Sequence, residues 1–285
     1  MSPALARAEI EAAFLAACHA ELNALKPGNV HVHASGHRMD VTHFERAATA
    51  AAPFIADPSL SIGKRLLYAT EASVTATGVN TNLGIVLLCV PLAKAAAETD
   101  AAMGLRRRLA VILSMLDADD ANDAFAAIRL ANPAGLGAAG DGDAHAPATM
   151  TLIQAMHLAA DRDRISNAYV TAYEDIFDFA LPALANARSR TDRDDLAITT
   201  LHMTLLSEFP DSHVVRKFGL EAARTLQMEA RALSSFWEPV ATPKSFKQLL
   251  EFDATLKARG LNPGTTADFV VATLFTALMS RRKQS

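Results

Sequence analysis

The sequence predicts an all-α protein, with a single compact, bundle-like domain of many helices over residues 1–285 and polar inter-helix loops that form the site. Alanine is the commonest residue, and aromatic residues make up only 6% of the chain. Such a composition favours closely packed helices over a sandwich or a barrel. No segment alternates apolar and polar residues for long enough to predict a strand.

The first helices are predicted from apolar spacing and from their breaks. Apolar residues at three- and four-residue steps predict a helix over residues 4–24. Lys26-Pro27-Gly28 ends it, because proline cannot continue a helix. A polar loop over residues 29–40 follows. Further helices are predicted from Val41 to near Pro53 and over residues 61–77.

The most apolar segment is residues 85–97, directly after a break at Gly78–Gly84. It contains Pro91 and is shorter than the ~20 residues that a membrane-spanning helix needs. It is therefore interpreted as a buried core helix. Helices over residues 105–116 and 119–130 follow.

The second half continues the helical pattern after a Gly- and Ala-rich stretch, residues 132–147, which is interpreted as a loop within the domain. Pro- and Gly-containing breaks at residues 210–213 and 260–264 separate the later helices. The predicted helices cover residues 149–161, 166–188, 192–207, 214–237, 245–259 and 266–279.

Charge and cysteine content exclude several classes of protein. The 27 Lys and Arg residues nearly balance 31 Asp and Glu residues, which argues against a nucleic-acid-binding protein. Hydrophobic residues make up 51% of the chain, which excludes a disordered protein. Cys18 and Cys89 lie in apolar helices and are predicted to be buried free thiols. The N-terminus lacks the pattern of a signal peptide. A cytoplasmic protein without membrane or nucleic-acid partners is predicted.

The richest polar cluster runs from Lys26 to Asp40 and contains three histidines, His31, His33 and His37. Histidines at this spacing are candidate metal ligands, but no thiolates or repeated carboxylates complete a zinc signature. A solvated loop with surface histidines is the favoured interpretation of the pattern alone.

The segment Gly78–Gly84 is a candidate phosphate site. Asn80 and Thr81, or Asn82, can cap the next helix, whose N-terminus offers free N–H groups to an anion. The two glycines allow close approach of a ligand to the backbone. The segment is neither a Walker A loop nor a dinucleotide fingerprint. An ordinary helix cap is the alternative.

Four further acidic positions have both a functional and a structural interpretation. Asp141 and Asp143 could hold Mg²⁺ in the loop, although a solvated acidic loop is favoured. Asp211-Ser212-His213 lacks the geometry of a catalytic triad, and N-caps are the simpler interpretation. Asp268 lies in the first turn of the last helix, where a carboxylate favours the helix dipole.

Several of these segments, taken in order, resemble one family. They are Lys26-Pro27-Gly28-Asn29-Val30, Gly36-His37-Arg38-Met39-Asp40, Gly78-Val79-Asn80-Thr81-Asn82-Leu83-Gly84, Asp211-Ser212-His213 and Asn262-Pro263-Gly264-Thr265-Thr266-Ala267-Asp268. The chain resembles the triphosphoribosyl-dephospho-CoA synthase family, also called ATP:dephospho-CoA triphosphoribosyltransferase, from Glu21 to about Met279.

The resemblance implies an all-α fold and an ATP-dependent transferase of cofactor biosynthesis. A ribose hydroxyl of dephospho-CoA displaces adenine at the anomeric carbon of ATP, through an oxocarbenium-like state. The triphosphate stays on the transferred ribose. Mg²⁺ is expected with ATP. A homodimer is possible for an apolar helical protein of this kind.

The resemblance also assigns roles to residues. Three carboxylates are candidates for acceptor activation or for metal binding: Asp40, Glu71 and Asp211. The candidates for substrate binding are Lys26, Asn29, His31, His37, Asn80, Thr81, Asn82, Gly84, Ser212, His213 and Asp268.

The chain departs from the family's pattern at several of these positions. His31 stands where the family usually has Asp, and Asn82-Leu83 stands where it has His-Lys. The family's Gly-Asp-Thr-Asn is Pro210-Asp211-Ser212-His213 here. Two alternatives follow. One is a divergent (phospho)ribosyltransferase for another cofactor, such as tetrahydromethanopterin. The other is a non-catalytic nucleotide-binding or scaffold protein.

Overall fold

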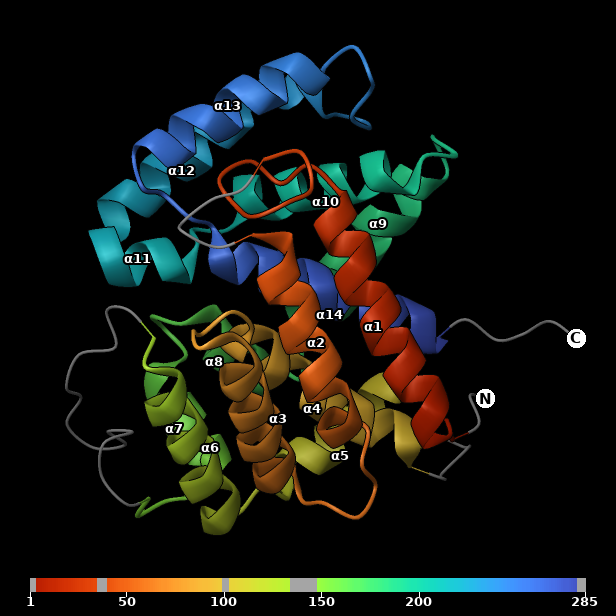
Figure 1. Ribbon diagram of the computed structural model, residues 1–285, viewed down its shortest axis with the longest axis vertical. Coiled ribbons are helices and arrows are strands. Elements are labelled where there is room, and N and C mark those ends of the chain that lie inside the picture. The colour runs from red at the N-terminus through yellow and green to blue at the C-terminus, as the bar shows by residue number, and fades with distance from the viewer. Residues whose placement is uncertain (1–3, 35–39, 99–102, 134–147, 281–285) are drawn as a thin grey trace, which may run out of the picture. The chain divides into compact units, whose positions relative to one another are not determined.

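The computed structural model of the chain describes residues 4–34, 40–98, 103–133 and 148–280 (Figure 1). Within these ranges the regular elements are helices, and the β structure amounts to one isolated bridge between His31 and Ala34. The all-α prediction is therefore confirmed.

Three residues considered as site candidates, His37, Asp141 and Asp143, lie outside the described residues. In the described part of the chain, no helix is long and apolar enough to cross a membrane. Cys18 and Cys89 are buried free thiols, as predicted.

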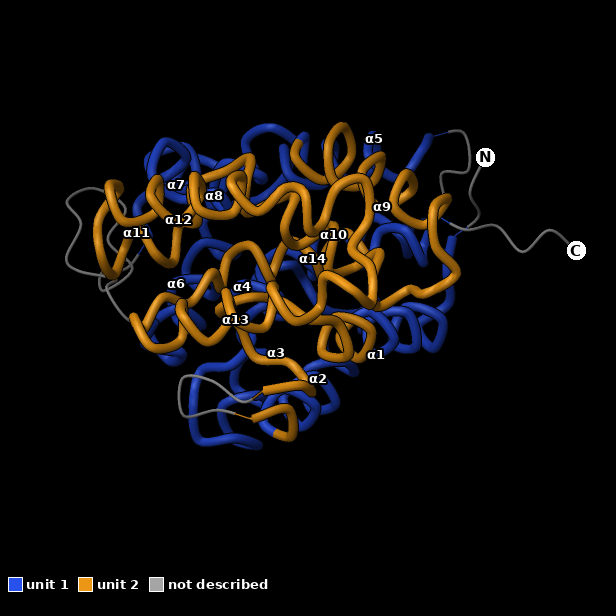
Figure 2. Tube along the Cα trace, turned by 90° about the horizontal axis from the view of Figure 1, so that it is seen from above, with its two compact units in different colours: residues 1–17, 43–174, 275–285 blue, residues 18–42, 175–274 orange. Residues whose placement is uncertain are grey.

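The chain divides into two compact units (Figure 2). Unit 1 comprises residues 1–17, 43–174 and 275–285, and unit 2 comprises residues 18–42 and 175–274. The division falls inside α1 (Arg7–Asn23) and α14 (Gly264–Ser280), so each of these helices contributes residues to both units. The prediction of a single domain over residues 1–285 stays a prediction.

Unit 1 is a set of helices packed on α3, α4 and α6. Its helices are α2 (Val41–Ile55), α3 (Ile62–Thr77), α4 (Leu83–Ala97), α5 (Leu105–Ser114), α6 (Ala118–Ala131), α7 (Leu152–Ala159) and α8 (Arg164–Val170). Gly63 allows α3 and α6 to approach closely, because a Cβ atom there would lie 2.7 Å from the Cα of Asp120. The N–H of Gly63 donates to Oδ1 of Asp120 at 2.7 Å.

Helix α4 is buried along nearly its whole length although Pro91 lies inside it. Proline has no N–H, so the carbonyl of Leu87, four residues earlier, loses its helical donor. The hydroxyl of Tyr169 donates to that carbonyl at 2.7 Å, and the hydroxyl of Tyr173 donates to the carbonyl of Leu88 at 3.1 Å. Two buried tyrosines therefore complete the hydrogen bonding of a core helix.

The prediction of one helix over residues 166–188 is wrong. Helix α8 ends at Val170, a π-helical turn follows at Asp175–Ala180, and α9 covers Leu181–Arg188. Between them Ala172 and Tyr173 have φ angles of 49° and 60°, a left-handed conformation that non-glycine residues rarely adopt. The buried hydrogen bond of Tyr173 to α4 outweighs the local preference for a continuous helix.

Unit 2 surrounds a second apolar core. Its helices are α9, α10 (Asp194–Glu208), α11 (Ser212–Phe218), α12 (Leu220–Ala232) and α13 (Phe246–Ala258), with its parts of α1 and α14. Met203, Leu226, Trp237 and Phe252 are among the buried side chains. The indole of Trp237 donates to the carbonyl of Ala230 at 3.0 Å, so its polar atom is satisfied inside the core.

The prediction of one helix over residues 214–237 is also wrong. The chain turns at Gly219, whose φ of 87° ends α11 before α12 begins. Helix α12 ends at Ala232, and a single 3₁₀ turn follows at Ser234–Phe236. Gly219 was the visible signal for this break, because glycine adopts positive φ without steric penalty.

Candidate functional site

The turn after α1 is the centre of the candidate site in unit 2. Gly28 has a φ of 85° and lies so close to the Asn262-Pro263-Gly264 segment that an added Cβ would come within 2.7 Å of Cδ of Pro263. Glycine is needed here both for the backbone conformation and for the close approach. Two of the segments singled out in the sequence are therefore in direct contact.

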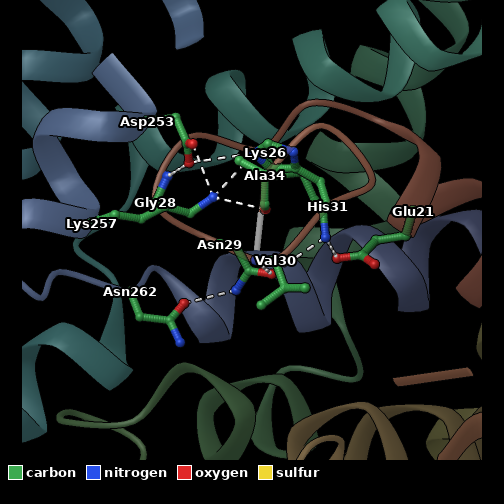
Figure 3. A network of polar contacts seen from close by, with 10 residues as sticks. All are labelled: Glu21, Lys26, Gly28, Asn29, Val30, His31, Ala34, Asp253, Lys257 and Asn262. Carbon is green, nitrogen blue, oxygen red and sulfur yellow. Dashed lines mark hydrogen bonds and ion pairs between the residues drawn. The ribbon is translucent and has the colours of Figure 1, made fainter. Parts of the chain in front are cut away.

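Lys26 is buried completely in this turn, with 0% of its surface exposed. Its ammonium donates to Oε1 of Glu21 and, at 3.3 Å, to Oδ1 of Asn29 (Figure 3). The amide of Asn29 donates in turn to Oδ1 of Asn262 at 2.8 Å. Burial lowers the pKa of Lys26 and raises the pKa of Glu21, and the contact between the two groups opposes both shifts.

Glu21 therefore compensates the charge of Lys26 inside the unit. Substrate binding by Lys26 and by Asn29 stays a prediction. What the geometry shows is that Lys26 and Asn29 connect the two motif segments through a chain of hydrogen bonds. Buried polar groups need such partners, because an unpaired one costs about 1–3 kcal/mol.

His31 lies on the other side of the same turn, facing α13. Its Nε2 lies 3.4 Å from Oδ1 of Asp253 and 3.4 Å from Nζ of Lys257. Oδ1 of Asp253 also accepts the N–H of Gly28 at 2.8 Å, and Oδ2 accepts Lys257 at 2.9 Å. Lys257 also donates to the carbonyl of Ala34 at 3.1 Å. Figure 3 shows Asp253 and Lys257 reaching the turn from the same side.

The protonation states in this cluster follow from burial and partners. Burial lowers the pKa of His31, with Asp253 opposing the shift. Burial raises the pKa of Asp253, but hydrogen bonds from His31 and Lys257 outweigh this effect, so its pKa lies below the ordinary value. Asp253 is thus a carboxylate and His31 a neutral imidazole at neutral pH.

Asp211 is a buried cap shared by two helices. Oδ1 accepts the N–H of Val214 at 3.0 Å, which makes Asp211 the N-cap of α11, as the structural interpretation predicted. Oδ2 accepts the N–H and the hydroxyl of Thr266 in the first turn of α14. Both carboxylate oxygens therefore have protein partners. Catalysis or metal binding by Asp211 stays a prediction.

The other unit 2 candidates lie at the ends of these helices. Ser212 is buried at the start of α11. His213 is half-buried, and its Nδ1 would lie 3.1 Å from a Cβ added to Gly264. Asp268 is half-buried in α14, just after its first turn. Asp40 is exposed before α2, where its Oδ1 accepts the hydroxyl of Thr42 at 2.7 Å.

Unit 1 holds the remaining candidates, most of them at the start of α4. Asn82 is the N-cap residue, but its side chain makes no cap hydrogen bond. Oδ1 of Asn80 accepts the N–H of Leu83 at 3.3 Å instead. Nδ2 of Asn82 and Oγ1 of Thr81 are buried and lack hydrogen-bond partners within the described part of the chain.

Gly84 is half-buried in the first turn of α4, and Glu71 is exposed on α3. The N-terminus of α4 thus combines backbone N–H groups with an amide and a hydroxyl that have no protein partner. Such a group of donors suits an anion.

Metal ligation by Asp40, Glu71 and Asp211 stays a prediction. Among the described side chains, no group of three or more His, Cys, Asp or Glu residues is arranged to hold a metal ion. Mg²⁺ commonly keeps several waters and binds through one or two carboxylates and substrate phosphates.

Three residues of the unit 2 network were not anticipated from the sequence: Glu21, Asp253 and Lys257. Glu21 lies in the last turn of α1 and belongs to none of the motif segments. Asp253 and Lys257 are four residues apart on α13, which is the spacing of an ordinary surface ion pair. Only their burial against the turn distinguishes them, and a single sequence does not reveal it.

Comparison with known proteins identifies relatives of the chain. A family model described as ATP:dephospho-CoA triphosphoribosyl transferase matches residues 7–285. A Pectobacterium atrosepticum protein named 2-(5''-triphosphoribosyl)-3'-dephosphocoenzyme-A synthase is 29% identical over 103 residues, 36% of this chain and 32% of the relative. A Pectobacterium carotovorum relative is 27% identical over 103 residues, which again cover 36% of this chain and 32% of the relative. The chain thus spans about a third of the length of the curated relatives it matches.

A crystal structure shares the fold. It is of a protein from Archaeoglobus fulgidus proposed to be a triphosphoribosyl-dephospho-CoA synthase. The TM-score is 0.60 at 24% sequence identity, and the match covers 81% of this chain and 96% of that chain.

Proposed function

The chain belongs to the ATP:dephospho-CoA triphosphoribosyl transferase family, and on that premise we propose that it transfers a triphosphoribosyl group from ATP to dephospho-CoA. A ribose hydroxyl of dephospho-CoA attacks the anomeric carbon of ATP. The bond from that carbon to adenine breaks, and adenine leaves with the bonding electron pair. The triphosphate remains on the transferred ribose.

The observation that carries the proposal is the set of unpartnered donors at the N-terminus of α4. The reaction retains a triphosphate, so the site must hold several negative charges while the glycosidic bond breaks. Thr81 and Asn82 offer a hydroxyl and an amide there, beside the positive end of the helix dipole. We assign one phosphate group of ATP to this end of α4.

A role for Mg²⁺ brought in with ATP is part of the proposal. Lys26 already has Glu21 as its partner, and Asp211 uses both oxygens on helix caps. The described residues do not form a cage for the ion. Bound Mg²⁺ would neutralise triphosphate charge.

The proposal extends to the setting of the reaction. The partners are small molecules, ATP and dephospho-CoA or a related cofactor precursor. Two buried free cysteines agree with a cytoplasmic location. A homodimer stays a prediction.

Release of adenine is the direct test. The full chain is incubated with ATP, Mg²⁺ and dephospho-CoA, and adenine is separated and quantified. Release that depends on dephospho-CoA, with a matching gain in mass of the acceptor, supports the proposal. Transfer to another acceptor only would favour the divergent transferase. Nucleotide binding without transfer, or no binding, would favour a non-catalytic role.

A further inference from the structure

We propose that His31 accepts the proton of the acceptor hydroxyl during transfer, and that Asp253 and Lys257 position its imidazole. This inference rests on the proposed function, and it assigns a catalytic role to a position where the chain departs from its family. The three residues form one buried cluster on the turn after α1 and on α13 (Figure 3).

Asp253 determines which ring nitrogen carries the proton. A carboxylate only accepts hydrogen bonds, so the tautomer with a proton on Nε2 matches Oδ1 of Asp253, 3.4 Å away. Lys257 also approaches Nε2, at 3.4 Å, but it already donates to Oδ2 of Asp253 at 2.9 Å and to the carbonyl of Ala34 at 3.1 Å. The lone pair of the imidazole is therefore on Nδ1.

Nδ1 of His31 is buried and has no hydrogen-bond partner among the residues that the structure describes. The residue is 1% exposed, so water does not satisfy this atom from bulk solvent. Buried polar atoms normally have partners, and an exception calls for an explanation. In a general base of this kind, a carboxylate holds one ring nitrogen of the imidazole, and the other nitrogen is available to accept a proton.

Burial and the neighbouring charges keep the ring neutral. Burial lowers the pKa of His31, and so do the cations Lys257 and Lys26, while Asp253 raises it. A neutral imidazole at neutral pH can take up a proton, and Asp253 then stabilises the imidazolium that forms.

An exposed histidine lies next to the buried ring. The ring of His33 lies 5.7 Å from the ring of His31, centroid to centroid, and His33 is an exposed residue. In the proposed step the acceptor reaches the buried imidazole past His33.

The proposed step is balanced. The oxygen of the acceptor hydroxyl forms a bond to the anomeric carbon as its proton moves to Nδ1 of His31. The bond between that carbon and the adenine nitrogen breaks, and its electron pair leaves with adenine. Adenine takes up one proton, which returns His31 to its neutral state directly or through solvent.

The kinetic test compares His31→Gln and His31→Ala with His19→Gln, which changes an exposed histidine of α1. Transfer is followed as adenine release between pH 5 and pH 9. We expect kcat to fall about 10²- to 10⁴-fold in both His31 variants, the range for loss of a general base. KM for ATP should change less than about threefold, and the acid limb of the pH profile should disappear. Added imidazole should partly restore His31→Ala.

Two outcomes overturn the proposal if wild type releases adenine. One is a folded His31→Gln variant with kcat within about threefold of wild type. The other is a loss of activity that leaves the acid limb in place and is not rescued by imidazole. A wild-type chain that releases no adenine contradicts the proposed function instead.

A spectroscopic test does not depend on activity. The ¹⁵N shifts of the ring nitrogens of His31 in the wild-type chain should show a proton on Nε2 and none on Nδ1 at pH 7. Asp253→Asn should weaken that preference and lower kcat more than it changes KM. A proton on Nδ1 in the wild-type chain would rule out His31 as the base even if every variant failed to fold.

Discussion

The carboxylate of Asp211 accepts two hydrogen bonds from Thr266, from the backbone N–H at 2.7 Å and from the hydroxyl at 2.8 Å. The other oxygen of Asp211 accepts the N–H of Val214. One side chain thus caps α11 and also holds the first turn of α14, although the two residues lie 55 positions apart. Asp211 is therefore a stability determinant of unit 2.

Replacing Asp211 should destabilise the protein strongly. We expect Asp211→Ala to lower the free energy of unfolding by about 2–4 kcal/mol, because a cap is lost and two buried donors of Thr266 lose their acceptor. Asp117→Ala is the matched control, since Asp117 caps only α6 and should cost about 1 kcal/mol. Urea unfolding measures both. A loss for Asp211→Ala no larger than that of the control would contradict the shared cap.

The close approach of Gly28 to Pro263 predicts a difference between two glycines. Gly28 and Gly78 have similar φ angles, 85° and 75°, but an added Cβ meets Cδ of Pro263 at 2.7 Å in the first case and nothing within 4 Å in the second. Each alanine should cost about 1–2 kcal/mol for its backbone conformation. Gly28→Ala should cost about 1–3 kcal/mol more from overpacking. Equal losses in thermal or urea unfolding would refute the contact.

The N-terminus of α4 predicts an effect on nucleotide affinity without an effect on stability. Asn82→Leu removes an amide that makes no cap hydrogen bond, so folding should be preserved. The Kd for MgATP should rise about 10- to 150-fold, because one hydrogen bond to a charged oxygen is worth about 1.5–3 kcal/mol. Thr81→Val should act in the same direction.

Thr151→Val is the control for this experiment. Thr151 caps α7 through its side chain, so its loss should lower stability by about 1 kcal/mol and leave the Kd for MgATP unchanged. Titration calorimetry with MgATP and with inorganic triphosphate separates phosphate contacts from base contacts. Unchanged Kd values for both Asn82→Leu and Thr81→Val would exclude this phosphate site.

His202 predicts a loss of stability in acid. It is completely buried in α10, and burial lowers its pKa to about 3. The unfolded chain, with an ordinary histidine pKa of about 6.5, binds a proton as the pH falls below that value, whereas the folded chain does not until about pH 3. Stability is therefore fully present above pH 6.5 and declines between about pH 6.5 and pH 3.

The size of this effect can be isolated with His202→Gln. At pH 5 the histidine should lower the free energy of unfolding by about 2 kcal/mol relative to pH 8. The variant has no histidine to titrate at this position. The difference in unfolding free energy between wild type and variant should therefore change by about 2 kcal/mol between pH 8 and pH 5. His19→Gln, at an exposed position, should show no such change. Parallel pH profiles for wild type and His202→Gln would contradict the buried neutral state.

Much of the fold could be predicted because its helices end at Pro, Gly and Asn. The breaks after α1 and before α4 are of this kind. The two errors have different causes. The break at Gly219 has a local signal, the glycine itself, which the apolar spacing over residues 214–237 masks. The break at Ala172 and Tyr173 has no local signal, because a buried hydrogen bond to α4 enforces it.

The motif residues of the candidate site could be predicted from the sequence, but the residues that contact them could not. Lys26 and Asn29 belong to the turn that the sequence singled out. The burial of Lys26 against Glu21 depends on how the turn packs, and neither spacing nor composition reports that. Asp253 and His31 lie 222 positions apart in the chain, so their contact depends on the tertiary structure.

Pro91 leaves the carbonyl of Leu87 without its helical donor, and Tyr169 replaces that donor. This replacement has a consequence for the order of folding. The donor to the carbonyl of Leu87 lies 82 residues later in the chain. During synthesis α4 leaves the ribosome long before Tyr169, and until then only water can satisfy that carbonyl. Such long-range closure is slow compared with local helix formation. We therefore expect the core of unit 1 to become fully buried only after residues 169–173 have been translated. The burial of α4 thus depends on a segment that is synthesised after it.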